Sequence, residues 1–364
     1  MNMGNLWGQR REYRKAIEHY ERVLEVSPYN PANTEKKLPE DCPIDVKFSS
    51  IVFSPKINNE AAYIDAHSNL AVMYIQIDEI EKAFTYCQKA LELQPENETS
   101  VVNFTDILRQ LGRKEEAIKR TWEQIVEATQ KVNPDYKGFQ ALQIKPWEKV
   151  PYEGEKKISV LSVKWGTRYP ASYVNKLYAG IKRYTTWAVD FYCFTEDPTD
   201  LHPDIKPMPL EEGWKKWWGK VTLFKDHGIK GRKFYIDLDM IITGSLDEMF
   251  EYGGQFSILR TGDLACEKNH KEGYNSSVMI WNDDILIPVY EALKHNFEFI
   301  NKYIVRFDFW LEMTINNADY VQALYPKQVV DYLADAQKGV PENSRVVCFA
   351  RKPKPDDYPA EWIR

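Results

Sequence analysis

A repeated pattern near the N-terminus restricts the first third of the chain to pairs of packed helices. Ala83 and Ala117 are 34 residues apart and share a context, Glu-Lys-Ala-Phe in one case and Glu-Glu-Ala-Ile in the other. Ala16, followed by Tyr20 and Pro28, begins a third copy of the pattern. Small residues that recur at such a period allow two antiparallel helices to approach closely, and successive pairs then stack. The sequence therefore predicts an all-α repeat domain.

This pattern resembles the tetratricopeptide repeat (TPR) family. Ala16 and Ala83 are 67 residues apart, so one repeat period of about 34 residues leaves a similar number unexplained. The surplus, at about 31–59, is rich in proline, asparagine and charge, which predicts an inserted loop. We assign 1–135 to TPR-like repeats. Such a module either binds a peptide or protein, including an acceptor, on its concave face or acts as a spacer or dimerisation element.

Composition narrows the class of partner. The net charge of −6 argues against nucleic acid or an anionic membrane as a bulk partner. The five cysteines are dispersed without a CxxC pair, which is typical of reduced intracellular thiols. The polar, basic start has no signal-peptide pattern, and no apolar run reaches the ~18 residues of a membrane span. We therefore expect a cytoplasmic chain without a membrane span.

The second domain is predicted to be α/β. Prolines without periodicity mark 136–154 as a linker, which leaves 155–364 for this domain. A β-branched apolar run at 157–163 predicts a buried parallel strand, and helical spacing follows at 171–184 before a second strand at 189–195.

Strand, helix and strand with short connections form a right-handed unit whose ligands bind at the carboxyl ends of the strands. This places 164–169 and 195–197 on the predicted binding edge. The chain has neither GxGxxG nor GxxxxGK[ST], which weakens a dinucleotide or P-loop interpretation.

Two carboxylates interrupt the apolar stretch 232–242. Asp237 and Asp239 are two residues apart, so at the end of a strand both point to one face. Burial of an unpaired charge is costly, so these carboxylates require partners. A pair on one face suits a hard divalent cation, which can neutralise a diphosphate. The alternative is a strand-end turn with solvated acids.

Several segments in order carry a second resemblance. They are Lys164-Trp165-Gly166 with Tyr169-Pro170, Cys193-Phe194-Thr195-Glu196-Asp197, Gly213-Trp214 with Trp217-Trp218, Phe234-Tyr235-Ile236-Asp237-Leu238-Asp239, Ile242-Thr243-Gly244-Ser245-Leu246-Asp247-Glu248-Met249-Phe250 and Tyr274-Asn275-Ser276-Ser277-Val278-Met279. Together, over about 157–355, they resemble bacterial or phage-type GT-A glycosyltransferases, related in layout to glycosyltransferase family 8. The resemblance implies a nucleotide-sugar-binding domain with a mixed, mainly parallel sheet between helices. It also implies transfer of a sugar from a nucleotide-sugar donor, a UDP-sugar first, to a saccharide or protein acceptor.

The same resemblance implies roles for individual residues. Asp237 and Asp239 would hold Mn²⁺ or Mg²⁺ on the donor diphosphate, where the metal helps the diphosphate to leave. The other residues that it places at the donor are Lys164, Trp165, Thr167, Tyr169, Lys220, Arg232, Asn275, Ser276 and Ser277. Asp308 resembles an acidic residue near the acceptor, as a base for the acceptor hydroxyl or a hydrogen-bond partner of the sugar, and its alternative role is a helix N-cap.

Some of these roles have structural rivals. Trp165 either contacts the nucleoside or is a core ring, and Arg232 either contacts the donor or is a solvated cation at the start of a strand. Trp217 and Trp218, beside Lys220, either stack on the donor or are buried.

One position departs from the resemblance. Ala350 stands where the family 8 pattern has a histidine that is a third metal ligand, and loss of this imidazole would weaken metal binding unless another group replaces it. Arg351 and Lys352 follow directly and could contact the diphosphate instead. This departure keeps a second hypothesis open, in which the chain is a non-catalytic TPR scaffold whose transferase-like domain binds a ligand or partner without turnover.

Overall fold

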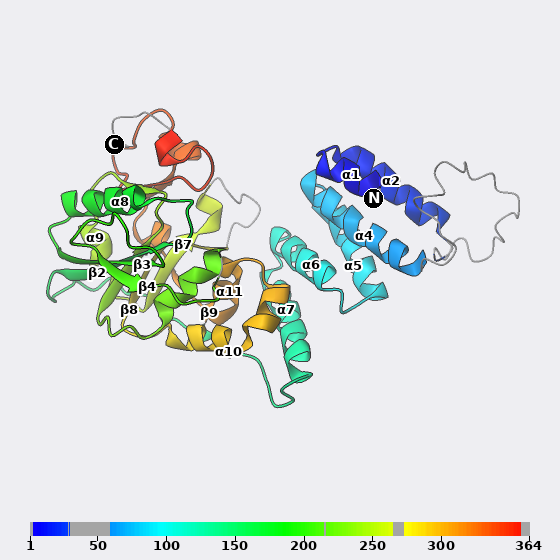
Figure 1. Ribbon diagram of the computed structural model, residues 1–364, viewed down its shortest axis with the longest axis horizontal. Helices are drawn as coiled ribbons and strands as arrows, with labels where there is room; N and C mark the ends of the chain where they lie inside the picture. Colours follow the sequence, from blue (N-terminus) through cyan, green and yellow to red (C-terminus); the bar gives the residue numbers. More distant parts are fainter. Residues whose placement is uncertain (1–2, 28, 30–58, 215, 265–272, 358–364) are drawn as a thin grey trace, which may run out of the picture. The chain divides into compact units, whose positions relative to one another are not determined.

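The computed structural model describes residues 3–27, 29, 59–214, 216–264 and 273–357 (Figure 1). The chain divides into two compact units, Met1–Tyr136 and Lys137–Arg364. The predicted insertion at 31–59 lies outside the described residues except for Asn59, which begins a helix.

The first unit consists of helices throughout its described part. These are α1 (Met3–Gln9), α2 (Tyr13–Val26), α4 (Asn59–Gln76), α5 (Ile80–Leu93), α6 (Glu98–Gln110) and α7 (Lys114–Gln130). Each helix packs against the next one along the chain, from α1 and α2 through to α6 and α7 (Figure 1). The prediction of an all-α repeat domain is confirmed.

The same turn joins the two helices of each repeat. Arg11, Asp78 and Gly112 all adopt a left-handed backbone, with φ of 61°, 63° and 74°. Each turn precedes one of the repeated alanines, Ala16, Ala83 and Ala117, by the same number of residues, and all three alanines are fully buried. The alanines thus occupy the positions of closest helix approach, where a larger side chain has no space.

The second unit is built on a seven-stranded sheet with the order β10-β7-β8-β5-β2-β3-β4. Its strands are β2 (Lys157–Lys164), β3 (Ala188–Thr195), β4 (Lys206–Pro209), β5 (Arg232–Ile236), β7 (Phe256–Arg260), β8 (Tyr274–Asn282) and β10 (Asp319–Tyr320). Only β8 runs against the others, so the sheet is mixed and mainly parallel, as predicted.

The helices of this unit cover the sheet and support its loops. They are α8 (Ala171–Arg183), α9 (Asp247–Phe250), α10 (Ile287–Tyr303), α11 (Phe307–Thr314), α12 (Val321–Leu324), the 3₁₀ helices η2 (Lys216–Phe224), η3 (Thr261–Asp263) and η5 (Pro355–Asp357), and the π-helix η4 (Tyr332–Ala336). In Figure 1, α8 lies on one side of the sheet and α10 on the other. The strand, helix and strand predicted at 157–163, 171–184 and 189–195 are confirmed as β2, α8 and β3.

The chain order of the strands creates a switch point between β2 and β5. From β2 the chain moves outward through β3 and β4, and it then returns to place β5 on the other side of β2. The loops that leave the two central strands consequently diverge at their carboxyl ends. Such a divergence leaves a crevice in which open α/β sheets bind ligands.

A second sheet starts where β5 ends. It has the order β11-β12-β6 and contains β6 (Met240–Ile242), β11 (Val329–Asp331) and β12 (Val346–Cys348). The pair β6 and β12 is antiparallel, and Cys348 lies opposite Met240. The turn 237–239 therefore connects two sheets, and β12 brings the C-terminal segment back to that turn.

The segment 136–154, interpreted from its prolines as a linker, belongs mostly to the second unit. It contains β1 (Leu142–Gln143), which pairs with β9 (Ile315–Asn316). The ring of Trp147 packs edge-on against Tyr252 with centroids 5.0 Å apart. Prolines disrupt helical and strand periodicity, but they do not prevent extended chain from packing on a core.

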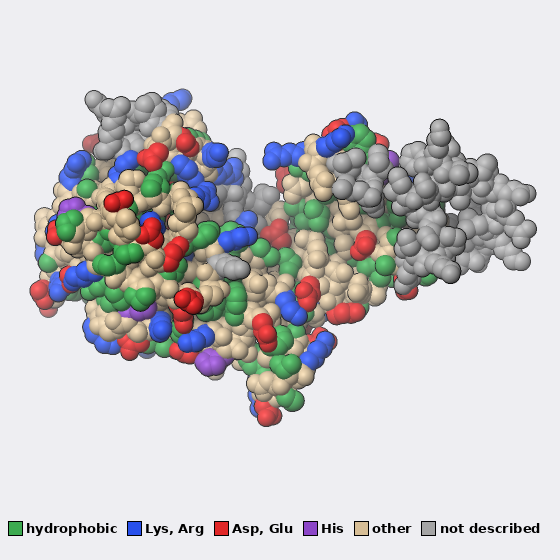
Figure 2. All heavy atoms as spheres, viewed as in Figure 1, with side chains coloured by type: hydrophobic (Ala, Val, Ile, Leu, Met, Phe, Trp, Pro, Cys, Tyr) green, Lys and Arg blue, Asp and Glu red, His purple; other side chains and the backbone are tan. Residues whose placement is uncertain are grey.

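The face of the molecule shown in Figure 2 carries both acidic and basic side chains, which are interspersed. Among the described helices, none combines the length and apolar character that a membrane span needs.

Ala83→Leu should destabilise the first unit, because overpacking of a closely packed site costs about 1–3 kcal/mol. Urea unfolding followed by circular dichroism at 222 nm would show an earlier helical transition. Glu81→Leu adds the same side chain at an exposed position of the same helix and should leave the transition unchanged. Equal effects of the two substitutions would contradict the close approach at Ala83.

Candidate active site

A pocket of about 420 Å³ lies at the carboxyl ends of β2 and β5, at the switch point of the sheet. Nine of the residues predicted from the sequence line it, namely Trp165, Tyr169, Lys220, Asp237, Asp239, Asn275, Ser276, Ser277 and Asp308. They come from the loop after β2, from η2, from the turn after β5, from β8 and from α11. Segments that are distant in sequence thus converge on one cavity.

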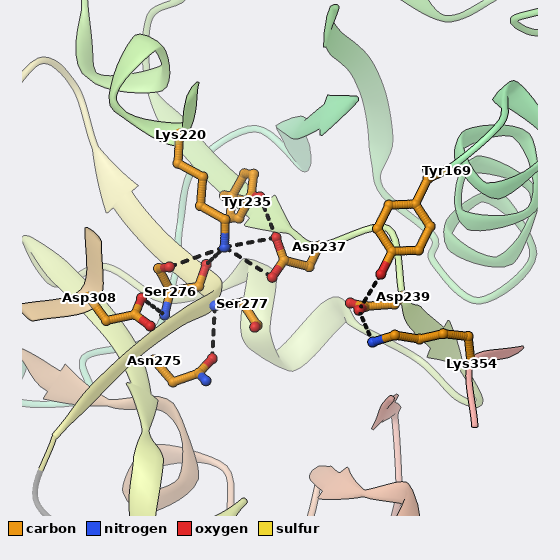
Figure 3. Close-up of polar contacts among 10 residues, drawn as sticks. All are labelled: Tyr169, Lys220, Tyr235, Asp237, Asp239, Asn275, Ser276, Ser277, Asp308 and Lys354. Atoms are coloured by element: carbon orange, nitrogen blue, oxygen red, sulfur yellow. Dashed lines mark hydrogen bonds and ion pairs between the residues drawn. The ribbon is translucent and has the colours of Figure 1, made fainter. Parts of the chain in front are cut away.

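Asp237 is paired with the ammonium group of Lys220. The Lys220 Nζ lies 2.9 Å and 3.0 Å from the two carboxylate oxygens of Asp237, and the side chains are 14% and 22% exposed. The same Nζ also donates to Oγ of Ser276 at 3.1 Å. The Tyr235 hydroxyl donates to Asp237 as well (Figure 3). Two side chains, Lys220 and Tyr235, therefore satisfy this carboxylate.

Asp239 has a different cation, Lys354, as its partner. Lys354 Nζ lies 2.7 Å from Oδ2 of Asp239, and the two side chains are 13% and 15% exposed. The Tyr169 hydroxyl donates to the same oxygen at 3.0 Å. Lys354 Nζ also donates to the carbonyl of Phe349 at 2.6 Å, which ties it to its own segment. Figure 3 shows the two carboxylates engaged by separate lysines from separate parts of the chain.

Burial and negative charge raise the pKa of both tyrosines of the site, which extends their protonated state to more alkaline pH. Desolvation is the larger cause and the charge of Asp239 the second, and together they raise the pKa of Tyr169 well above its usual value. Desolvation followed by the charge of Asp237 does the same to the pKa of Tyr235. Both hydroxyls therefore remain hydrogen-bond donors to the carboxylates at physiological pH.

A bulge in β8 exposes the strip 275–277 to the pocket. Between β7 and β8 the register passes from Ile258 opposite Met279 to Leu259 opposite Asn275. The intervening residues of β8 have no partner in β7, which allows their side chains and backbone to be redirected.

Two contacts from outside β7 hold this bulge. The backbone N–H of Ser276 donates to Oδ1 of Asp308 at 2.9 Å, and the N–H of Asp237 donates to the carbonyl of Ser277 at 2.9 Å. Asn275 Oδ1 accepts the N–H of Ser277 at 3.0 Å, which closes a local turn. The strip is thus fixed by α11 on one side and by the acidic turn on the other.

These contacts decide one of the open alternatives. The residue at the N-cap position of α11 is Arg306, and Asp308 lies within the first turn with its carboxylate on Ser276 instead of on its own helix. The interpretation of Asp308 as a helix N-cap is therefore wrong. Its half-buried carboxylate lines the pocket.

Two tryptophan rings at the pocket are open to solvent. Trp165 is 40% exposed and Trp217 is 41% exposed, whereas Trp218 is 5% exposed and packs on Phe297 and Phe307. Trp217 is fixed by a bond from its Nε1 to the carbonyl of Val305 at 2.7 Å. The alternative of a core ring is therefore wrong for Trp165 and correct for Trp218.

Five predicted residues lie outside the lining of the pocket. Lys164 is buried and donates to the carbonyl of Asp197, while Thr167, Arg351 and Lys352 are exposed. Arg232 begins β5, at the end of the strand opposite the acidic turn, and its guanidinium lies 4.2 Å from the ring centroid of Tyr152. The structure does not bring Arg232 to the pocket, because the strand itself separates the two ends.

Sequence reasoning missed four residues of the site. Tyr235 and Lys354 hold the acidic pair, and Arg168 and Arg306 line the pocket. Alternation along β5 could have found Tyr235, because it lies on the face of Asp237 and Asp239. Lys354 left only the weak signal of a second Lys-Pro pair after Ala350.

The residues present do not fit the divalent cation that the resemblance implies. Ala350 lines the pocket, as expected for the family's third ligand, but it offers no ligand atom. Across the described residues, no group of three or more His, Cys, Asp or Glu side chains is placed to hold a metal. Both carboxylates are already occupied by ammonium groups and tyrosine hydroxyls. A dication on the pair would have to displace or oppose two lysines.

One comparison with protein families concerns the helical unit. A family model described as a tetratricopeptide repeat matches residues 64–97. No curated protein matches the sequence.

Solved structures similar to the chain include glycosyltransferases and a TPR domain. The galactosyltransferase LgtC, in complex with donor and acceptor sugar analogues, is 10% identical over 54% of this chain and 88% of that one, with a TM-score of 0.40. The glycosyltransferase GlyE of Streptococcus pneumoniae TIGR4 is 13% identical over 54% of this chain and 56% of that one, with a TM-score of 0.38. The C-terminal TPR-containing domain of a Plasmodium falciparum FK506-binding protein is 19% identical over 37% of this chain and 74% of that one, with a TM-score of 0.25.

Asp308→Ala should destabilise the second unit by about 1–3 kcal/mol, because the Ser276 N–H is left without its acceptor. Asp308→Asn keeps an acceptor oxygen and should stay within about 1 kcal/mol of the parent. Urea unfolding followed by tryptophan fluorescence measures both. Glu298→Ala, at an exposed position of α10, is the control, and a cost of Asp308→Ala no larger than this control would refute the positioning role of Asp308.

Proposed function

We propose that the chain transfers a sugar from a nucleotide-sugar donor, a UDP-sugar, to a hydroxyl group of a saccharide or protein acceptor. The observation that carries this proposal is the composition of one pocket. Its volume of about 420 Å³ is within the ~300–1,000 Å³ of small-molecule sites. It combines open aromatic rings, one ammonium and two guanidinium groups, and a strip of amide, hydroxyl and carboxylate groups. These match the nucleobase, diphosphate and sugar of such a donor.

The parts of the donor have separate partners in this arrangement. The nucleobase of the donor stacks on Trp165 beside Tyr169 at the end of β2, because an exposed ring offers an apolar face to a planar heterocycle. The diphosphate lies toward the cationic groups, of which Lys220 is fixed by Asp237 and Ser276. The sugar faces the strip Asn275–Ser277, whose amide and hydroxyl groups can hydrogen-bond its hydroxyls.

The chemical step breaks one bond and forms another. The bond between the anomeric carbon and the diphosphate oxygen breaks, and the nucleoside diphosphate leaves with the electron pair. An acceptor hydroxyl oxygen forms the new bond to the anomeric carbon, and its proton passes to a base. Asp308 is the base that the pocket offers, because its carboxylate lines the cavity beside Ser276.

The helical unit supplies a means of acceptor choice. Tetratricopeptide repeats form concave surfaces suited to peptides. The helical unit would therefore present the acceptor to the transferase-like unit. The described cysteines Cys87, Cys193 and Cys348 are buried and form no disulfide, which supports a reducing compartment such as the cytoplasm.

One of a panel of UDP-, GDP- and CDP-sugars should release its nucleoside diphosphate when incubated with the protein. Release measured with a coupled nucleotide assay should fall about 100-fold or more in Asp308→Asn, which keeps the contact to Ser276 but cannot accept the proton. Binding of a donor without turnover, on every acceptor tried, would favour the non-catalytic scaffold. Absence of binding by the whole panel would refute a nucleotide-sugar site.

Trp165→Ala should raise the dissociation constant of the donor about 10-fold or more, since loss of one base–aromatic stack costs about 1–3 kcal/mol. Trp165→Phe retains a ring and should recover most of the affinity. Isothermal titration calorimetry with the nucleoside diphosphate gives both values. An unchanged affinity in Trp165→Ala would place the base elsewhere in the pocket.

A further inference from the structure

We infer that the pocket holds the donor diphosphate with two lysines, Lys220 and Lys354, in the role that a divalent cation would otherwise have, so that donor binding is independent of metal. The inference rests on the proposed function and specifies how that site recognises its ligand. Its basis is the set of contacts around the acidic pair.

Each carboxylate of the pair is matched by one ammonium group. Lys220 Nζ contacts both oxygens of Asp237, and Lys354 Nζ contacts Oδ2 of Asp239. Both lysine side chains are largely buried, at 14% and 13% exposed. The two ammonium groups thus neutralise the negative charge of the acidic pair. A bound metal would otherwise do so.

Both lysines are also fixed by neutral acceptors. Lys220 donates to Oγ of Ser276 at 3.1 Å and to its carbonyl at 3.3 Å, and Lys354 donates to the carbonyl of Phe349 at 2.6 Å. A cation held by several acceptors loses little side-chain freedom when an anion binds, because its position is already set. The aspartates then act as positioning residues. With two acceptors among the described residues, Lys354 keeps one N–H for a phosphate oxygen, whereas the N–H groups of Lys220 all have acceptors and this lysine contributes its charge.

Cationic groups gather at the pocket without added metal. Arg168 and Arg306 line it together with Lys220, and Lys354 contacts it through Asp239. Among the described residues, the carboxylates of Asp237, Asp239 and Asp308 lie with them. The cationic groups favour a diphosphate and the further negative charge that the leaving oxygen gains when it takes the bonding electrons.

A metal would find a poor site among these same residues. Ala350 contributes no ligand, so the protein would supply two carboxylates at most from the acidic pair, both already bound by lysine. Hard divalent cations usually require several oxygen ligands, and two neighbouring ammonium groups would repel the cation. The segment after β12 thus offers Asp239 an ammonium group, from Lys354, and no metal ligand at Ala350.

Metal dependence of binding tests the inference directly. The full chain is titrated with UDP, GDP and CDP by isothermal titration calorimetry, once in EDTA and once in Mn²⁺. The tightest nucleotide should bind with affinities that agree within about 3-fold. In EDTA, Lys354→Ala should weaken binding about 10- to 100-fold, the value expected for a lost hydrogen bond to a charged group. Lys230→Ala removes a lysine from an exposed ion pair with Asp284 outside the pocket and should bind as the parent does.

The outcomes separate this inference from the proposed function. Binding that appears only with Mn²⁺ would overturn the lysine site and leave the nucleotide-sugar proposal intact. Equal affinities of Lys354→Ala and Lys230→Ala in EDTA would also overturn it. A failure of all three nucleotides to bind in either condition would overturn both proposals. A gain of Mn²⁺ response in Lys354→Ala would add support, because removal of the ammonium group frees Asp239.

Discussion

Asp237 and Asp239 lie where β5 ends and the chain crosses to the second sheet, so two negative charges border a buried strand. Carboxylates in such a position are stable only when cations or several donors meet them. Lys220 and Tyr235 meet the first, and Lys354 and Tyr169 meet the second. The elements that carry these partners, from the loop after β2 to the C-terminal segment, therefore converge on the turn, and their convergence forms the pocket.

The second structural constraint is the bulge in β8. Because Ser276 and Ser277 lack partners in β7, their backbone groups bond to Asp308 and to Asp237 instead. A regular strand would direct alternate side chains away from the cavity. The bulge thus links α11 to the acidic turn, and it explains how a residue on a helix can act on a site built at strand ends.

Periodicity in the sequence predicted the helical repeats and the first strands of the sheet, whereas the mixed sheet was implied by the family resemblance. The alanine spacing predicted the helical repeats, and the apolar run at 157–163 predicted the first strand of the sheet. The family resemblance placed Arg232 at the donor site, but Arg232 begins β5 and the pocket lies at the other end of that strand. The bulge and the contact of Lys354 with Asp239, across 115 positions, were beyond local patterns, because they depend on strand pairings between distant segments.

The backbone of the segment after β12 determines which side chains of this segment meet Asp239. Antiparallel pairing of β12 with β6 places Cys348 opposite Met240, and the N–H of Phe349 then donates to the carbonyl of Asp239 at 3.1 Å. The segment that follows β12 is thereby held against the acidic turn, whichever side chains it carries. A ligand atom at position 350 and an ammonium group at position 354 would compete for the same carboxylate. Ala350 offers no ligand atom, so the backbone that could have supported a metal ligand holds the ammonium group of Lys354 at Asp239 instead.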